Sequence, residues 1–401
     1  MRIAILGYGT VGKGLVEMIE GNKEKRNIEI TNILVRNKDK YKSSKYSDKI
    51  TENIEDVFNT DIDILVELMG GLHPSYEYIK RALENKINVV TANKDMLAEY
   101  GDKLVKISKD NKVSLRFEAS VGGGIPVLKP LTESLEGNDI ESVYAILNGT
   151  TNFILSKMYD EGLPYEEVLK EAQDLGFAEA NPEADVEGYD AARKLSILST
   201  LAYHRRVYWK DFYLEGISNI DMKDIDYAKK MGCKIKLVGQ SRKNDKTVSG
   251  FVRPVLVDNN SLLSKIDNEY NIVVLNGNSV GELSFVGKGA GKEPTGSAVY
   301  SDLIDILDKR ISNIDSFMKD KIEVEKTISS NCQVLLRFKS PKKEEIIEII
   351  KTCVDKYEII EDNDELAIMV YADSEYEINN ILCLIKDKGY CKESRKILKI
   401  S

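Results

Sequence analysis

The sequence predicts an α/β protein in three parts, and three observations support this fold class. Apolar runs typical of buried parallel strands alternate with amphipathic helices through residues 2–118. Helices and β-type runs then mix, without crossover helices between the later strands, which predicts a mostly antiparallel sheet in an α+β domain. After residue 312 the order strand, helix, strand, strand, helix, strand predicts a ferredoxin-like unit. We expect domains at 1–130 (completed by about 295–312), 131–294 and 325–401.

Composition restricts the classes of function. The 401 residues are 42% hydrophobic and 31% charged, as in a soluble globular protein. The net charge of −9 disfavours nucleic acid as a partner, because phosphate binding needs a surplus of Lys and Arg. The five cysteines form no CxxC pair and the chain has two histidines, so we expect reduced thiols and no zinc site. With no secretory leader and no run of membrane-spanning length, we expect a cytoplasmic protein.

The amino terminus reads strand, glycine loop, helix. The apolar run Arg2–Leu6 is followed at once by Gly-Tyr-Gly-Thr-Val-Gly and an amphipathic helix. In this arrangement the first glycine permits a tight turn, the second lets the backbone approach a pyrophosphate, and the third allows close helix packing. The sequence therefore predicts a Rossmann domain that binds NAD(P), and the expected cofactor contacts here are Gly7, Gly9, Thr10, Val11 and Gly12.

The ends of the next strands supply further candidates. The second strand, Ile28–Val35, is followed by Arg36. A carboxylate at this place would bind the ribose hydroxyl of NAD and repel a 2′-phosphate, whereas an arginine attracts the phosphate. NADP is therefore favoured, and NAD remains the alternative. Gly70 follows a third strand as another cofactor contact. Lys94 follows a fourth and is a candidate cation beside the nicotinamide or the substrate. Gly289 and Gly291 lie in a second glycine-rich loop before a predicted helix at Gly296–Lys309; the loop either covers the cofactor or acts as a hinge.

Carboxylates gather ahead of one lysine in the segment Ala172–Lys194. A helix is predicted from near Asp185 through Leu201, and at about 100° per residue Lys194 falls within its apolar arc. A buried ammonium needs a partner, and burial moves its pKa toward the range useful for proton transfer. Asp190, at i−4, is the expected partner, and Glu179 lies in the loop before. An ordinary surface pair of Asp190 and Lys194 is the competing interpretation.

These motifs together resemble the homoserine dehydrogenase family. The resemblance covers residues 1–310 and includes the amino-terminal glycine loop, Thr-Ala-Asn-Lys at 91–94, Leu-Asn-Gly-Thr-Thr-Asn-Phe at 147–153, the 172–194 block and Gly-Ala-Gly at 289–291. It implies reversible NAD(P)-dependent oxidation of L-homoserine to L-aspartate 4-semialdehyde, in threonine and methionine biosynthesis. Lys194 would be the acid/base with Lys94 nearby, and Glu179, Asp185 and Asp190 would bind the substrate. The predicted antiparallel sheet with helices on one face is a kind of surface that often forms a dimer contact, so we expect a homodimer or a higher homo-oligomer.

The resemblance carries two further expectations. A structural monovalent cation such as Na⁺ would be held by Glu118 and the backbones of Val121, Gly123 and Ile125; a simple tight turn is the alternative. The C-terminal unit resembles an ACT regulatory module, but Lys-Ser-Pro-Lys-Lys at 339–343 replaces the usual acidic, glycine-bearing loop, so an oligomer contact is the alternative to effector binding.

Competing functions stay open. One is a non-catalytic NAD(P)-binding regulatory protein, and another is a different NAD(P)-dependent hydroxy-amino-acid dehydrogenase. A semialdehyde dehydrogenase acting through a thioester would need an activated cysteine, and Cys233 sits in an apolar lead into a strand with no histidine nearby in the sequence.

Overall fold

The computed structural model describes residues 1–328, 330–361, 363 and 365–400; residues 329, 362, 364 and 401 of the expected C-terminal domain lie outside the described residues. The chain divides into two compact units. The first comprises Met1–Val143, Arg193–Trp209 and Asn271–Ile322, and the second comprises Tyr144–Ala192, Lys210–Tyr270 and Glu323–Ser401. The three domains expected from the sequence are a division by function and differ from these two compact units, so their boundaries stay predictions.

The first unit contains the predicted doubly wound sheet. Its strand order is β3-β2-β1-β4-β5-β6, and every neighbouring pair is parallel. This is the strand order of a Rossmann domain, so the predicted fold class is confirmed. The strands are β1 Arg2–Leu6, β2 Glu29–Leu34, β3 Ile50–Thr51, β4 Ile64–Glu67, β5 Asn88–Thr91 and β6 Leu115–Arg116. The two-residue strand β3 was not predicted from the sequence.

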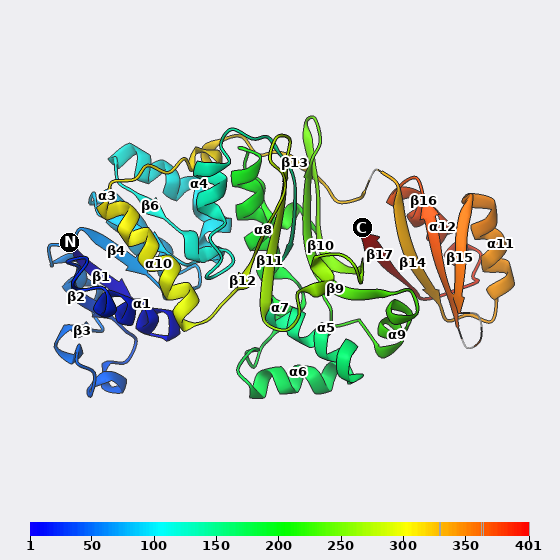
Figure 1. The fold of residues 1–401 in the computed structure, drawn as a ribbon, viewed down its shortest axis with the longest axis horizontal. Coiled ribbons are helices and arrows are strands. Elements are labelled where there is room, and N and C mark those ends of the chain that lie inside the picture. The colour runs from blue at the N-terminus through cyan, green and yellow to red at the C-terminus, as the bar shows by residue number, and fades with distance from the viewer. Residues whose placement is uncertain (329, 362, 364, 401) are drawn as a thin grey trace. The chain divides into compact units, whose positions relative to one another are not determined.

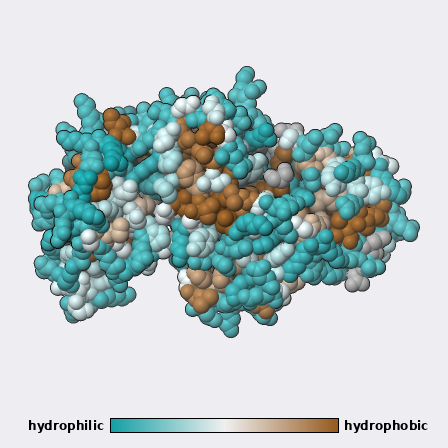
Figure 2. Space-filling view, in the orientation of Figure 1, coloured by the Kyte–Doolittle hydropathy of each residue, from teal (hydrophilic) through white to brown (hydrophobic). Residues whose placement is uncertain are grey.

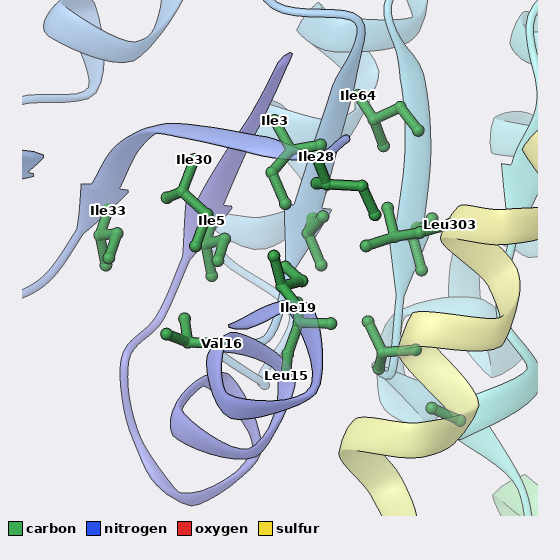
Figure 3. Packing of buried hydrophobic residues seen from close by; sticks show 14 of the residues in the cluster. Ile3, Ile5, Leu15, Val16, Ile19, Ile28, Ile30, Ile33, Ile64 and Leu303 are labelled. Carbon is green, nitrogen blue, oxygen red and sulfur yellow. The ribbon is translucent and has the colours of Figure 1, made fainter. Parts of the chain in front are cut away.

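Helices cover this sheet and close its core. They are α1 Thr10–Gly21, α2 Ile54–Phe58, α3 Ser75–Glu84, α4 Lys94–Asn111 and, from much later in the chain, α10 Lys292–Leu307. Figure 3 shows Ile3 and Ile5 of β1 facing Leu15 and Ile19 of α1, with Leu303 of α10 beside them. Burying each such side chain contributes about 1.5–3 kcal/mol, so the late helix is part of the core of the first domain.

The contact between α1 and α10 depends on glycine. A Cβ at Gly14 would lie 2.1 Å from the carbonyl oxygen of Lys292, and one at Gly296 would lie 2.8 Å from the carbonyl carbon of Gly14. The helices therefore meet backbone to backbone, as Figure 1 shows for blue α1 and yellow α10. The predicted return of the chain to the first domain is observed, and α10 begins four residues earlier than expected.

The strands β7–β13 and the helices α5–α9 are shared between the rest of the first unit and the second unit. Strand β7, Ile140–Ile146, runs from the first unit into the second, while β11 and β12 belong to the first apart from Tyr270. The strands are β8 Tyr213–Leu214, β9 Cys233–Lys243, β10 Thr247–Asp258, β11 Tyr270–Gly277, β12 Gly281–Lys288 and β13 Glu323–Glu325. The helices are α5 Gly149–Glu161, α6 Tyr165–Asp174, α7 Glu183–Val186, α8 Tyr189–Ala202 and α9 Met222–Lys230.

Short helical turns join these elements. They are η1 Lys38–Tyr41, η2 Ser47–Lys49, η3 Glu118–Ser120, η4 Pro130–Ser134, η5 Trp209–Asp211, η6 Leu263–Lys265 and η7 Asp315–Met318. The long pair β9 and β10 is antiparallel, as predicted. However, β10 also pairs in parallel with β8, β13 and β17, so the sheet of the second unit is mixed. The parallel partners come from distant parts of the chain, which periodicity does not reveal.

One predicted helix is in fact two. The sequence predicted a helix from near Asp185 through Leu201, whereas α7 ends at Val186 and α8 begins at Tyr189. Gly188 lies between them with a φ of +79°, a left-handed conformation that interrupts the helical hydrogen bonding. The apolar arc of the second helix is nevertheless as predicted, because its members Ala191, Leu195, Leu198, Leu201 and Ala202 are all buried.

The C-terminal segment has the predicted βαββαβ order. Its elements are β14 Cys332–Phe338, α11 Lys343–Cys353, β15 Lys356–Glu361, β16 Leu366–Ala372, α12 Glu375–Asp387 and β17 Ser394–Ile400, with the sheet order β17-β14-β16-β15. Strand β17 pairs with β10, placing Leu398 opposite Val255. The segment thus shares a sheet with the rest of its unit. The visible face in Figure 2 is mainly hydrophilic, with a hydrophobic patch over this segment.

A buried ion cluster reinforces this junction. Arg253 of β10 donates to both oxygens of Glu375, at 2.6 and 3.1 Å, and Lys396 of β17 donates to Glu375 at 2.8 Å. Burial alone would raise the pKa of Glu375, but the hydrogen bonds and charges of Arg253 and Lys396 lower that pKa to about 2. Removing either partner from so buried a carboxylate is expected to be costly.

Candidate active site

A cavity of about 490 Å³ in the first unit is lined by four of the predicted cofactor residues. Gly7 and Gly9 line it from the first loop, Arg36 from the end of β2, and Gly70 from the loop after β4. These loops follow the carboxyl ends of neighbouring parallel strands, where ligands bind in open α/β sheets. Four predicted cofactor contacts, which come from three separate parts of the sequence, therefore line one cavity.

The first loop requires its glycines. Gly7 has a φ of +102°, and a Cβ there would lie 2.7 Å from the carbonyl oxygen of Leu68. A Cβ at Gly12 would lie 2.3 Å from the carbonyl oxygen of Gly7. Thr10 and Val11 open α1, whose N-cap is Gly9, so backbone N–H groups at this helix start are available to an anion. The geometry fits a pyrophosphate.

The wall of the cavity beyond the end of β2 is basic and aromatic. Arg36 is exposed at the cavity wall, and Lys40 and Tyr41 of η1 line the same wall. The hydroxyl of Tyr41 donates to the carbonyl oxygen of Tyr8 at 3.2 Å, which ties η1 to the glycine loop. Lys40 had not been identified from the sequence, although it lies close after the strand end that carries Arg36.

The second glycine-rich loop lies elsewhere. Gly289 and Gly291 are not part of the cavity wall, and Gly291 instead precedes α10 with a φ of +120°. A Cβ at Gly289 would lie 2.0 Å from the side chain of Asn271, and one at Gly123 would lie 2.4 Å from the carbonyl oxygen of Gly289. The Asn271 side chain thus explains Gly289, and the left-handed φ explains Gly291, so the role of both glycines as cofactor contacts stays a prediction.

Lys94 is the first residue of α4, directly after β5. The side chain of Asn93 caps this helix by accepting from the backbone N–H of Met96 at 3.1 Å, and its amide donates to the carbonyl oxygen of Gly71 at 2.7 Å. The helix that carries Lys94 is thereby hydrogen-bonded to the loop that carries Gly70. This places Lys94 at the same edge of the sheet as the cofactor cavity, as predicted.

Lys194 lies on α8 between buried leucines and is itself half-buried. Its neighbour Arg193 forms an ion pair with Asp95 at 3.3 Å, and the Arg193 guanidinium lies 4.6 Å from the ring centre of Trp209. Asp95 directly follows Lys94 on α4. The two predicted catalytic lysines are therefore each adjacent in sequence to one member of an ion pair within the first unit.

The acidic residues belong to the second unit, where an asparagine joins two of them. The side-chain amide of Asn148 donates to Asp185 at 2.7 Å and to Asp190 at 2.9 Å. Asn148 also caps α5, accepting from the backbone N–H of Thr151 at 2.9 Å. Asp190 is buried and Asp185 is half-buried, whereas Glu179 is exposed. Asn148 had been assigned no role from the sequence, although it stood within the family motif at 147–153.

Glu118, the predicted cation ligand, has several backbone partners. Its carboxylate accepts from the N–H groups of Val127 and Leu128 at 2.7 and 3.0 Å, and of Lys129 at 2.9 Å. Burial raises the pKa of Glu118 to about 7, with a further contribution from the charge of Asp302. The side chain therefore stabilises the segment leading into η4, and its oxygens are largely occupied.

The adjoining turn holds the other predicted ligands. Gly122 and Gly123 have φ values of +70° and +54°, and the N–H of Ile125 donates to the carbonyl oxygen of Gly122 at 2.8 Å. Val121 and Ile125 are buried. Within the described part of the chain, no group of three or more His, Cys, Asp and Glu residues is placed to hold a metal ion. A cation in this turn would therefore be held by backbone oxygens together with the single carboxylate of Glu118.

A parallel sheet in Rossmann order, a cavity walled by its glycine loops and a lysine at the same edge define a nicotinamide-dependent oxidoreductase. The family model described as "Homoserine dehydrogenase, NAD binding domain" matches residues 7–118, and that described as "Homoserine dehydrogenase" matches residues 126–304. The chain belongs to the homoserine dehydrogenase family, so it is an NAD(P)-dependent oxidoreductase that acts on a CH–OH group. The resemblance stated from the motifs is confirmed.

Individual relatives agree with the family models. A homoserine dehydrogenase of Bacillus subtilis (strain 168) is 42% identical over 315 residues, which cover 77% of this chain and 73% of the relative. The crystal structure of one from Thiobacillus denitrificans has a TM-score of 0.92 at 34% identity and covers 100% of this chain and 98% of that one. A hyperthermophilic archaeal homoserine dehydrogenase in complex with NADPH has a TM-score of 0.67 at 27% identity, with coverages of 78% and 98%.

Within the described residues, no helix is long and apolar enough to cross a membrane.

Proposed function

We propose that the protein interconverts L-homoserine and L-aspartate 4-semialdehyde, with Lys194 as the acid/base. The observation that carries this proposal is the arrangement on and beside α8: Asn148 joins Asp185 to Asp190, and Lys194 follows Asp190 by one turn within the apolar arc. Such an arrangement combines an amine for proton transfer with carboxylates that attract the substrate ammonium.

The residues of the chain would divide the work as follows. Asp185 and Asp190, with Glu179, would bind the amino group of homoserine. Lys194 would take the proton of the hydroxyl group, because an aliphatic alcohol is too weak an acid to lose it unaided, and Lys94 would assist beside the reacting carbon. When bound, the nicotinamide accepts the hydride from that carbon or returns it. In the reverse direction Lys194 would give the proton back.

We propose NADP as the preferred coenzyme, with NAD as the alternative. Arg36 and Lys40 lie on one wall of the cavity, where their positive charges would bind a 2′-phosphate. In addition, the structure of a relative was solved in complex with NADPH. We keep Gly289 and Gly291 as contacts of the bound dinucleotide. The supporting observation is that α10, which begins just after Gly291, packs on α1 behind the first glycine loop.

Further parts of the proposal concern structure and setting. A monovalent cation such as Na⁺ would be held by Glu118 and the backbone oxygens of Val121, Gly123 and Ile125, in a structural role. The C-terminal unit would be an ACT-like module. We also propose a homodimer or higher homo-oligomer that works in the cytoplasm, in threonine and methionine biosynthesis.

Substrate choice tests the central proposal. The purified protein is mixed with NADP⁺ and a panel containing L-homoserine, L-serine, L-threonine and the D-enantiomer of homoserine, and the absorbance of the reduced nicotinamide is followed. We expect kcat/KM for L-homoserine to exceed the others by about 100-fold, since the α-ammonium and the hydroxyl must be held at one spacing. A higher value for another hydroxy amino acid would support the alternative dehydrogenase, and no turnover of any would support a regulatory protein.

A further inference from the structure

Glu67 is a fully buried carboxylate at the end of β4. It occupies the last position of Ile-Leu-Val-Glu, a strand in the middle of the parallel sheet, where an apolar residue is the usual choice. Nothing in the proposed chemistry uses it so far. Burying a charge here is unfavourable unless hydrogen bonds compensate, so its partners indicate what the carboxylate does.

One oxygen of Glu67 binds the loop after β4. Glu67 Oε1 accepts from the backbone N–H of Met69 at 2.8 Å and of Gly70 at 3.1 Å. The hydroxyl of Ser75 lies 3.2 Å from the same oxygen and 3.1 Å from the carbonyl oxygen of Gly70. Met69 and Gly70 both line the cofactor cavity. This oxygen therefore holds the cavity wall in place through neutral donors.

The other oxygen of Glu67 binds the strand that leads to Lys94. Thr91, at the end of β5, donates its hydroxyl to Glu67 Oε2 at 2.7 Å, and the same hydroxyl oxygen accepts from the backbone N–H of Asn93 at 3.0 Å. Asn93 caps the helix that Lys94 begins. The chain of contacts thus runs from the cavity wall through one carboxylate to the backbone of the lysine.

We propose that Glu67 is a positioning residue that sets the cofactor-binding loop and Lys94 in register with each other. The two oxygens act on different elements, so the two effects are separable: Ser75 belongs to the branch toward the cofactor, and Thr91 to the branch toward the lysine. The inference rests on the proposed function, because it takes Gly70 as a cofactor contact and Lys94 as part of the catalytic site.

Three variants separate the branches: Ser75→Ala, Thr91→Val and Glu67→Gln. A glutamine keeps an oxygen for the two N–H groups of the loop, but its –NH₂ group can only donate to the hydroxyl oxygen of Thr91. The hydrogen bond that Thr91 donates to a charged oxygen is then lost, so Glu67→Gln should change the branch toward the lysine in the same direction as Thr91→Val. The control is Thr132→Val, because Thr132 is also buried and its hydroxyl donates to the carbonyl oxygen of Leu128 at 3.1 Å, away from this network. For each we measure the NADPH dissociation constant by fluorescence, kcat with L-homoserine, and the melting temperature.

We expect Thr91→Val and Glu67→Gln to lower kcat about tenfold while the NADPH dissociation constant stays within about twofold. Ser75→Ala should raise the dissociation constant about threefold, with kcat at saturating cofactor nearly unchanged. The inference is overturned if these variants alter only the melting temperature, as Thr132→Val should, or if both constants change equally in all three. Failure of the proposed function is distinct, because the wild-type protein would then not oxidise L-homoserine at all.

Discussion

Replacing Asn148 by serine tests the acidic part of the proposed substrate site. Serine keeps the capping of α5, since its hydroxyl can accept from the N–H of Thr151, but it loses the amide that donates to Asp185 and Asp190. A hydrogen bond to a charged group contributes about 1.5–3 kcal/mol. The bond to buried Asp190 should count nearly in full, whereas half-buried Asp185 can turn toward water.

The expected loss in the free energy of unfolding is therefore about 2–4 kcal/mol, the sum of one full bond and one discounted bond. Both carboxylates keep other contacts, which favours the lower end. Urea unfolding measures this loss, and steady-state kinetics should show a higher KM for L-homoserine with the KM for NADP⁺ unchanged. Asn148→Ala adds the loss of the cap, about 1 kcal/mol more. The reasoning is refuted if Asn148→Ser unfolds as the wild type does and binds homoserine equally well.

Three further outcomes are expected. Arg36→Ala should lower kcat/KM for NADP⁺ by about tenfold relative to NAD⁺, and equal ratios in the two proteins would exclude a contact with the 2′-phosphate. Gly14→Ala should cost about 2 kcal/mol of unfolding free energy because its Cβ would meet Lys292 at 2.1 Å, whereas Gly21→Ala, where nothing lies within 4 Å, should be neutral or stabilising in the same urea titration. In the folded state the pKa of Glu375 is lowered from 4.5 to about 2, so its ionised form contributes stability above pH 4.5 that is lost as the pH falls toward 2. This contribution is roughly 3 kcal/mol of unfolding free energy. Glu375→Gln should therefore make the unfolding free energy depend less on pH between 4.5 and 2, and an unchanged pH dependence would contradict this.

Local patterns predicted those features that depend on neighbouring residues. The glycine loop after β1, the apolar arc of α8 and the βαββαβ order all follow from spacing within a short window, and each is observed. The break at Gly188 was not predicted, because a glycine inside a helical pattern can either continue or end the helix. Its φ of +79° shows that it ends the helix here.

Features that depend on distant residues were beyond the sequence. Asn148 meets Asp185 and Asp190 only after folding brings residues about 40 positions apart together. Glu67 is the last residue of β4, and its partner Thr91 lies on the next strand of the sheet, β5. Likewise, the parallel pairing of β10 with β17 joins segments separated by more than a hundred residues. Periodicity carries no information about such contacts.

The role of Lys194 is tested most directly by replacing it with alanine and measuring turnover in both directions together with NADPH affinity. The matched control is Lys170→Ala, which removes an exposed lysine from α6. We predict that Lys194→Ala lowers kcat by about 1,000-fold in both directions while the NADPH dissociation constant changes less than about twofold, and that the control behaves as the wild type. Turnover close to that of the wild type in Lys194→Ala would contradict the proposed mechanism.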